Sequence, residues 1–222
     1  MTKKKAAAST GNHRTRVGRE RRQQTEARIL RAAVNVFANK SFQDVNVNDF
    51  LVEANVSRGT FYNHYRTNEE LLAAVIEFLH EDLTKIIEAV IAPFTDPVVR
   101  LSLAIRIFYR KAMSDPVWAD LVSARVIAAA GTSTGLRRDL LEGRKLGAFR
   151  FNDPSLGVEL VIGTMLRHTH ARCQQGWRMR NQNELVRLVL RGLGAAEARI
   201  DAALAVPVPT LTRKPHTFRK NR

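Results

Sequence analysis

The sequence predicts an all-α protein, in which a small N-terminal three-helix domain is joined by a long helix to a larger helical domain. Two observations predict this fold class. Apolar residues recur at three- and four-residue spacing along most of the 222-residue chain, and no stretch alternates convincingly with a period of two. Because 45% of the residues are hydrophobic, the chain can bury a sizeable core, and we expect about nine or ten helices.

Two early segments show the helical spacing most clearly. In residues 26–39 one face carries Ala27, Leu30, Ala33, Val34 and Phe37. In residues 67–91 the apolar stripe is longer, and it consists of Leu72, Val75, Ile76, Leu79, Leu83, Ile86, Ile87 and Val90. Thr67 and Glu70 have the spacing of a capping box at the start of this second helix, and Pro93 is expected to end it.

Three later helices are predicted to begin with the same device, an Asp followed by Pro at the first helical position. The pairs are Asp96-Pro97, Asp115-Pro116 and Asp153-Pro154. The Asp side chain can accept hydrogen bonds from free backbone amides, and Pro fits where no donor is needed. Further helical patterns cover residues 134–146, 184–193 and 195–204.

The net charge of +15 is concentrated at the two ends of the chain, since residues 1–24 and 206–222 together hold +12 of it. Basic ends suggest a polyanionic partner, either nucleic acid or an anionic membrane, although they can also serve only as solubilising tails. No run of apolar residues is long enough to span a membrane, and the N-terminus does not have the pattern of a secretory signal. The single Cys173 allows no internal disulfide and fits a reducing cytoplasm.

Residues 45–65 predict two short helices joined by a tight turn, which is the pattern of a helix-turn-helix. Asn46 can cap the first of these helices, with Asp49 reaching back in the sense of a capping box. Asn55 can adopt the left-handed conformation that the turn requires, and Ser57 can cap the second helix. The alternative is an ordinary surface helix of mixed polarity.

The side chains of this segment divide into an inner and an outer face. The apolar set expected to hold the second helix in place is Phe50, Ala54, Val56, Phe61 and Tyr65. The residues left pointing outward are Arg58, Thr60, Asn63 and His64, with Tyr62 at the margin. Such a face combines donors for base edges with groups that bind phosphate, and Gly59 removes bulk where the backbone would approach a groove.

Residues 25–80 resemble the N-terminal domain of TetR/AcrR-type transcriptional regulators, over about a quarter of the chain. The resemblance is carried by Ile29-Leu30, Ala32-Ala33, Phe37, Phe42, Val47, Phe50, the run from Ala54 to Tyr65, and Glu69-Glu70-Leu71-Leu72. It implies an all-helical dimer with a variable C-terminal ligand domain. It also implies Ser57, Arg58, Thr60 and Asn63 near base edges or adjoining phosphates, and Asn46, Tyr62 and His64 on the phosphate backbone.

The chain departs from the family pattern at three positions. Ser41 and Asn55 stand where the family usually has Gly, and both are residues that a turn tolerates. Asn68 occupies the place of a Lys that typically touches a DNA phosphate. Losing that cation should weaken affinity without changing sequence preference, because phosphate contacts carry no base information.

The central helices carry bulky side chains that suggest a cavity for a mainly apolar effector, although a plain helical core is the alternative. The candidate lining residues are Phe108, Tyr109, Met113, Trp118 and Met165. Residues 156–172 and 185–193 could pack against a symmetry mate. His168 and His170 project about 200° apart on a helix, which argues against a shared metal ion. The loop from Gly131 to Gly135 lacks the residues of a phosphate loop, and no catalytic constellation is evident, so neither a cofactor nor an enzyme is expected.

These expectations combine into one reading of the chain. It has a basic, flexible arm over residues 1–22, a helix-turn-helix domain over 23–82, a helical effector-binding and dimerisation domain over 83–205, and a basic tail over 206–222. We expect a homodimer that binds double-stranded DNA at a near-palindromic operator, is released by a small-molecule effector, and does not bind membranes. The alternative is a non-specific nucleic-acid-coating protein without an effector.

Overall fold

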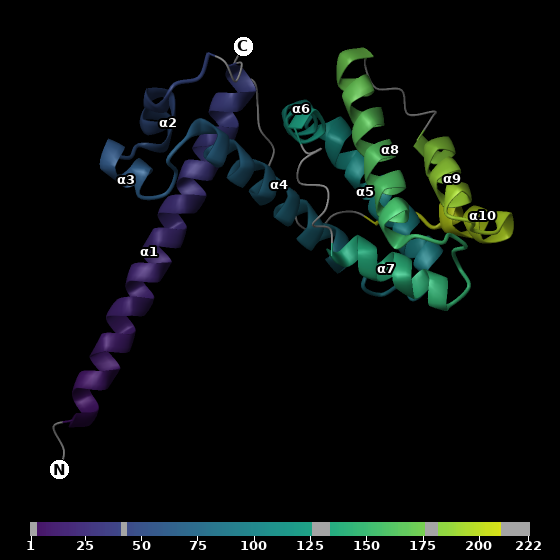
Figure 1. The fold of residues 1–222 in the computed structure, drawn as a ribbon, viewed down its shortest axis with the longest axis horizontal. Coiled ribbons are helices and arrows are strands. Elements are labelled where there is room, and N and C mark those ends of the chain that lie inside the picture. The colour runs from purple at the N-terminus through teal and green to yellow at the C-terminus, as the bar shows by residue number, and fades with distance from the viewer. Residues whose placement is uncertain (1–3, 41–43, 126–133, 176–181, 210–222) are drawn as a thin grey trace. The chain divides into compact units, whose positions relative to one another are not determined.

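The computed structural model describes residues 4–40, 44–125, 134–175 and 182–209, which contain ten helices and no strand (Figure 1). The helices are α1 (Lys4–Asn39), α2 (Val47–Ala54), α3 (Arg58–Tyr62), α4 (Asn68–Ile91), α5 (Pro97–Ser114), α6 (Pro116–Arg125), α7 (Thr134–Lys145), α8 (Pro154–Gln175), α9 (Gln182–Gly192) and α10 (Glu197–Ala205). The all-α prediction is confirmed. Ser41, residues 131–133 of the glycine loop and the basic tail from residue 210 lie outside the described residues.

The chain divides into two compact units, with the boundary inside α4 between Val75 and Ile76. The first unit contains α1, α2, α3 and the start of α4, and the second contains the rest of α4 and the later helices. In neither unit is any described helix both long enough and apolar enough to cross a bilayer.

Helix α1 begins at Lys4, far ahead of residues 26–39, where the apolar spacing predicts a helix. Residues 4–25 include three Ala, five Arg, two Lys and two Gln, which favour helix, but they contain no apolar stripe. Periodicity therefore could not detect this part of the helix. From Lys4 onward, the basic arm expected over residues 1–22 is part of α1.

The two ends of α4 follow from local chemistry. At its start the Thr67 hydroxyl accepts from the Glu70 amide at 3.1 Å, as the capping box predicts. The Glu70 carboxylate, however, accepts from the amide of Arg66 at 2.8 Å, one residue before the expected donor. At its other end α4 stops at Ile91, two residues before Pro93, as predicted.

All three Asp-Pro pairs begin a helix, as predicted. Asp96 accepts from the amide of Val98 at 2.7 Å, Asp115 from Trp118 at 3.0 Å, and Asp153 from Ser155 at 2.7 Å. Pro97, Pro116 and Pro154 are the first residues of α5, α6 and α8.

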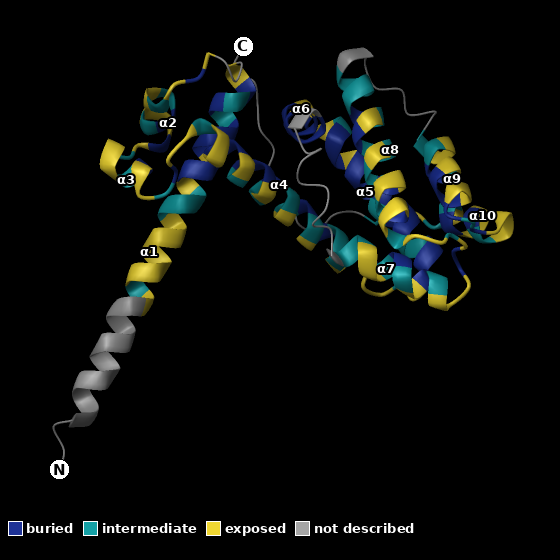
Figure 2. Ribbon diagram, viewed as in Figure 1, coloured by how far each residue is buried: buried dark blue, intermediate teal, exposed yellow. Residues whose placement is uncertain are grey.

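Helix α5 lies at the centre of the second unit, and 11 of its residues are buried; Figure 2 shows buried residues along it. It packs against α6, α7, α8, α9 and α10, and α6 and α7 also pack on α8. Its buried residues include a complete ion pair, because Lys111 Nζ lies 2.7 Å from Asp115 Oδ2 and both side chains are almost fully excluded from solvent. The second unit therefore buries charge as well as apolar surface.

Candidate nucleic-acid interface and cavity

The turn between α2 and α3 has the local structure that the sequence predicts. Asn46 accepts from the Asp49 amide at 3.2 Å, and Asp49 accepts from the Asn46 amide at 3.0 Å, so the capping box is complete. Asn55 adopts the left-handed conformation, with φ 49° and ψ 56°. The Ser57 side chain accepts from the Thr60 amide at 3.1 Å and caps α3.

A cluster of aromatic rings fixes α3 against α1 and α2. The rings of Phe50 and Phe61 stack with centroids 6.0 Å apart, and Phe37 of α1 meets Phe50 edge-on at 5.3 Å. Tyr65 packs against Phe61 and directs its hydroxyl to Glu26 Oε1 at 3.5 Å. Burial, reinforced by Glu26, raises the pKa of the Tyr65 phenol, so it stays a neutral donor. The orientation of α3 is thereby set by buried contacts.

The outward side of α3 remains polar and accessible. Arg58 and Asn63 are exposed, and Thr60 is half-buried. The Arg58 guanidinium donates to the side-chain oxygen of Asn48 on α2 at 2.7 Å, which orients it while leaving its other donors available. Arg22 of α1 reaches the backbone oxygen of Asn63 at 3.4 Å. Sequence reasoning missed Asn48, although its place in the first turn of α2, two residues after the Asn46 cap, could have indicated it.

The remaining candidates border this face. Tyr62 is exposed, and its ring meets that of Phe61 edge-on at 5.7 Å. His64 is half-buried beside the ring of Tyr65. Asn46 and Ser57 are exposed at the starts of α2 and α3, with their side chains engaged in capping. An alanine side chain at Gly59 would meet no atom within 4 Å, so the surface of α3 is open at this point.

Asn68, which replaces the family's usual Lys, has a structural contact. Its side-chain amide donates to the backbone oxygen of Val45 at 3.2 Å, directly before the cap of α2. Its side-chain oxygen is buried without a hydrogen-bond partner. The residue therefore ties the start of α4 to the start of α2 within the first unit.

The second unit encloses a cavity of about 160 Å³, bounded by parts of α4, α5, α6, α7 and α8. Of the five candidate residues, Phe108, Trp118 and Met165 line it, and so does Ala104. Tyr109 and Met113 do not line it. Tyr109 is fully buried with its ring edge-on to His168, and the Met113 sulfur accepts from Gln182 at 3.2 Å. On α5, Tyr109 lies about 100° round the helix from Phe108, which explains the different direction.

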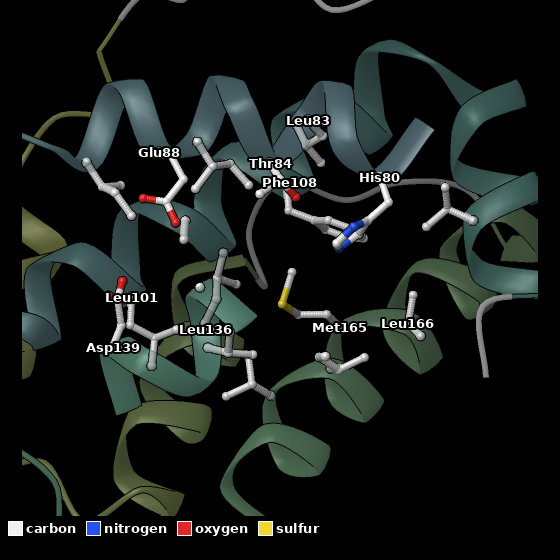
Figure 3. A pocket seen from close by; sticks show the side chains of 18 of the residues that line it. His80, Leu83, Thr84, Glu88, Leu101, Phe108, Leu136, Asp139, Met165 and Leu166 are labelled. Atoms are coloured by element: carbon white, nitrogen blue, oxygen red, sulfur yellow. The ribbon is translucent and has the colours of Figure 1, made fainter. Parts of the chain in front are cut away.

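Sequence reasoning missed a row of polar groups on the α4 wall of this cavity. His80, Thr84 and Glu88 follow one another at four-residue spacing and all line it. Figure 3 shows these three side chains descending from α4, with Met165 of α8 on the opposite side. Within the described residues, neither the His80 imidazole nor the Thr84 hydroxyl makes a hydrogen bond to the protein. The four-residue spacing of polar residues beside the apolar stripe could have signalled this row.

Two carboxylates and two guanidinium groups meet at one end of the cavity. Asp139 accepts from Arg100 at 2.9 Å and from Arg138 at 3.3 Å, so both of its oxygens are engaged. Glu88 accepts from Arg138 at 3.4 Å, and Arg100 lies 4.0 Å away. Arg100 also donates to the backbone oxygen of Ile91 at 3.0 Å, at the end of α4. These four residues form a charge quartet with no formal net charge.

Along α8 and α9 the second unit exposes apolar side chains that its own helices leave uncovered. Leu156 and Leu188 are more than half exposed, and Leu160 is 37% exposed. Gly163 and Leu185 border an open groove between the two helices. In the described parts of the chain, no three metal-ligand side chains lie close enough together to hold an ion.

The comparisons with known proteins agree with this architecture. Residues 29–75 match the family model "Bacterial regulatory proteins, tetR family". The chain is 29% identical over 148 residues to the HTH-type transcriptional regulator CymR of Pseudomonas putida. This matched segment is 65% of this chain and 70% of that protein. It is also 28% identical over 68 residues to the HTH-type transcriptional repressor Rv3405c of Mycobacterium tuberculosis, covering 31% of this chain and 36% of that protein.

The fold extends beyond the matched N-terminal segment. The crystal structure of RolR in complex with resorcinol superposes with a TM-score of 0.71 at 24% sequence identity, covering 87% of this chain and 99% of that one. Both units therefore have counterparts in a solved regulator. The relatives are transcriptional regulators and not enzymes. From the family match, the relatives and the helix-turn-helix, we conclude that residues 29–75 form a tetR-type DNA-binding domain and that the chain is similar to HTH-type transcriptional regulators.

Proposed function

We propose that the chain is a homodimeric transcriptional repressor that reads a near-palindromic operator with α3 and leaves it when a small, mainly apolar ligand binds. The observation that carries this proposal is the polar outer face of α3, held in one orientation by the buried Phe50 and Phe61 rings and the half-buried Phe37 ring. A rigid support with exposed donors is what reading base edges in a major groove requires.

The proposal assigns the outer residues two roles. Ser57, Arg58, Thr60 and Asn63 lie at base edges or adjoining phosphates. Asn46, Tyr62 and His64 contact the phosphate backbone. The exposed Arg58 and Asn63 are the best suited to discriminate bases, because guanidinium and amide groups can form paired hydrogen bonds with purines.

Dimerisation is assigned to α8 and α9. Their exposed leucines, Leu156, Leu160 and Leu188, form an apolar surface that a second copy could cover about a two-fold axis. In this arrangement residues 23–82 form the DNA-binding domain and residues 83–205 the effector-binding and dimerisation domain. Two recognition helices related by a two-fold axis would read two halves of a near-palindrome.

Release by a ligand is supported by the enclosed cavity in the second unit. Most of its lining is apolar, including Leu101, Ile105, Phe108 and Trp118. RolR has been crystallised with resorcinol, and its fold is similar to this one. A ligand that binds better to the conformation unable to bind DNA must weaken DNA binding by the same factor by which DNA weakens ligand binding.

The DNA-reading role is tested by comparing a selected operator with random DNA in fluorescence anisotropy titrations. Arg58→Ala or Asn63→Ala should cost about 1–3 kcal/mol on the operator and less on random DNA. His64→Ala should weaken both, because a phosphate contact carries no sequence information. Equal losses on the two DNAs from Arg58→Ala and Asn63→Ala would mean that these residues do not read bases.

The same titrations separate this function from non-specific coating. A specific regulator should prefer its operator over random DNA by about 10³ or more, and a coating protein should not. Deleting residues 1–18 removes five basic side chains and no acidic one. The deletion should weaken binding to all DNA and reduce the salt dependence of affinity. An unchanged salt dependence would favour a solubilising role for the arm.

The effector role is tested with Ala104→Phe, because Ala104 lines the cavity. Filling the cavity should abolish the response of DNA binding to cavity ligands and leave the affinity of the unliganded protein for the operator near normal. If ligands stabilise the wild-type protein but leave its operator affinity unchanged, the proposed coupling is wrong.

A further inference from the structure

We propose that the cavity is built for an uncharged compound of one aromatic ring that carries hydroxyl groups. The effector role of this compound rests on the proposed function. The chemical class of the compound does not depend on it. It is drawn from the volume of the cavity, the nature of its two walls and the charges around it.

The volume limits the occupant to about one ring. The cavity encloses about 160 Å³. An engineered protein cavity of about 150 Å³ lined by aliphatic and aromatic side chains accepts benzene. A substituted single ring fits this space, whereas a long acyl chain or a molecule with several fused rings would extend beyond it.

The α5 and α6 side chains of the lining suit an aromatic ring. Phe108 and Trp118 meet edge-on, with centroids 5.2 Å apart, and both line the cavity. Met165 reaches the same space from α8 (Figure 3). Aromatic rings favour edge-to-face contacts with other rings, and thioether sulfur packs favourably against ring edges.

The α4 wall supplies hydrogen-bonding groups along a single edge. His80, Thr84 and Glu88 span eight residues of α4, a rise of about 12 Å. The imidazole and the hydroxyl can each donate or accept, and the carboxylate accepts. Glu88 has only long contacts with its arginine partners, at 3.4 and 4.0 Å, so its acceptor capacity is not used up. A hydroxyl group, which both donates and accepts, matches all three.

The charges favour an uncharged ligand. Among the described residues no Lys or Arg lines the cavity, so a ligand carboxylate would lose its hydration without gaining a cation. A ligand ammonium would gain little, because the charge quartet of Arg100, Arg138, Glu88 and Asp139 is already balanced. Glu77 also lines the cavity, but it is exposed to solvent, which screens its charge.

The test is calorimetric titration of the full chain with four compounds of one ring each: benzene-1,3-diol, toluene, benzoate and benzylammonium. The diol should bind at least about tenfold more tightly than each of the other three, which corresponds to the net contribution of one or two hydrogen bonds. Benzoate or benzylammonium binding as tightly as the diol would overturn the proposal.

Variants on α4 locate the hydrogen bonds. Thr84→Val keeps the shape of the side chain and removes its hydroxyl, so it should weaken the diol about five- to tenfold and leave toluene unchanged. Glu88→Gln should also weaken the diol selectively. The control is Glu81→Gln, the same change on the same helix at a residue that does not line the cavity and pairs with Lys85 on the surface. Equal diol affinity in wild type, Thr84→Val and Glu88→Gln would overturn the assignment.

A DNA titration with each bound compound separates this inference from the proposed function. Preferential binding of the diol without any change in operator affinity would support the ligand class and contradict the effector role. Release of operator by benzoate with no binding of the diol would contradict the ligand class and support the effector role.

Discussion

The face of α3 and the cavity of the second unit both depend on polar side chains, but they hold those side chains differently. On the α3 face two side-chain pairs, Ser57 with Thr60 and Arg58 with Asn48, join residues within ten positions of each other and are open to water. Around the cavity Arg100 reaches Asp139, 39 residues away. Substitution on the α3 face should therefore change DNA binding more than stability, and substitution of buried residues in the second unit should change stability more than DNA binding.

The largest effect on stability is expected from Asp115→Ala in α5–α6. The change leaves Lys111 buried beside Trp118 without its carboxylate and removes the cap of the Trp118 amide. Truncating one partner of a buried ion pair typically costs about 3–5 kcal/mol. Urea denaturation should show a loss of this size in the free energy of unfolding.

The control for this prediction is Asp201→Ala, which removes the same group from an exposed pair with Arg187. Exposed pairs contribute about 0–1 kcal/mol, so the free energy of unfolding should change little. If both variants lost the same stability, the contrast between buried and exposed charge in this protein would be wrong.

A second prediction compares the same substitution, Gly to Ala, in α7 of the second unit and in α3 of the first. At Gly143 in α7 a Cβ would overlap the ring of buried Phe149 and lie 3.2 Å from Pro97 Cβ, so we expect a loss of about 1–3 kcal/mol in stability. At Gly59 in α3 the Cβ has open space, so we expect a gain of about 0.5–1 kcal/mol from the better helix propensity.

Thermal unfolding of the two glycine variants checks both predictions, because stability should fall in Gly143→Ala and rise in Gly59→Ala. Anisotropy titration adds a second readout for Gly59→Ala, whose operator affinity should fall because the new methyl group stands where α3 would approach DNA. A variant that is less stable, or that binds the operator as wild type does, would contradict this part of the comparison.

The smallest effect is expected from Lys40→Met, which removes the 2.6 Å contact with Asp49. The hydrogen bond from Lys40, followed by that from the Asn46 amide, lowers the pKa of Asp49 from its ordinary value of 3.8. A lowered pKa in the folded state stabilises the protein above the unfolded pKa, and this contribution disappears as the pH falls through the folded pKa. For so exposed a pair, the contribution at pH 7 should be below about 1 kcal/mol.

Urea titrations of wild type and Lys40→Met at pH 7 and at pH 3 check this prediction. The difference in the free energy of unfolding between the two proteins should shrink as the pH falls, since Asp49 becomes protonated. A difference that grew at low pH would have the wrong sign for a carboxylate with a lowered pKa.

The features that sequence alone predicted well are those decided within about four residues. The Asn46 cap, the left-handed Asn55 and the three Asp-Pro starts each depend on one side chain and a nearby amide. The continuation of α1 to Lys4 was missed because no apolar stripe marks it. The local sequence also suggests Arg58 and Asn63 as outward residues, and both are exposed, although their contact with DNA remains a prediction.

The cavity could be predicted only in part, because it is assembled from five helices. The size of the side chains correctly predicted that Phe108, Trp118 and Met165 line the cavity. Side-chain size also predicted Tyr109 and Met113, which do not line the cavity, because the residues that face it depend on how α5 is rotated against its neighbours. The polar row on α4 has a local four-residue spacing, but the neutral charge quartet depends on pairings up to 50 residues apart, which no local pattern reveals.

The contact between Asn68 and Val45 has a consequence for how this regulator can change by mutation. In the genetic code, Asn and Lys codons differ only at the third base. A single base change can therefore replace the amide that ties α4 to α2 with the cation usual at this position in the family. One such step would exchange an internal tether for a longer, charged side chain at the position that the family resemblance assigns to a DNA phosphate, and it would leave the outward residues of α3 unchanged.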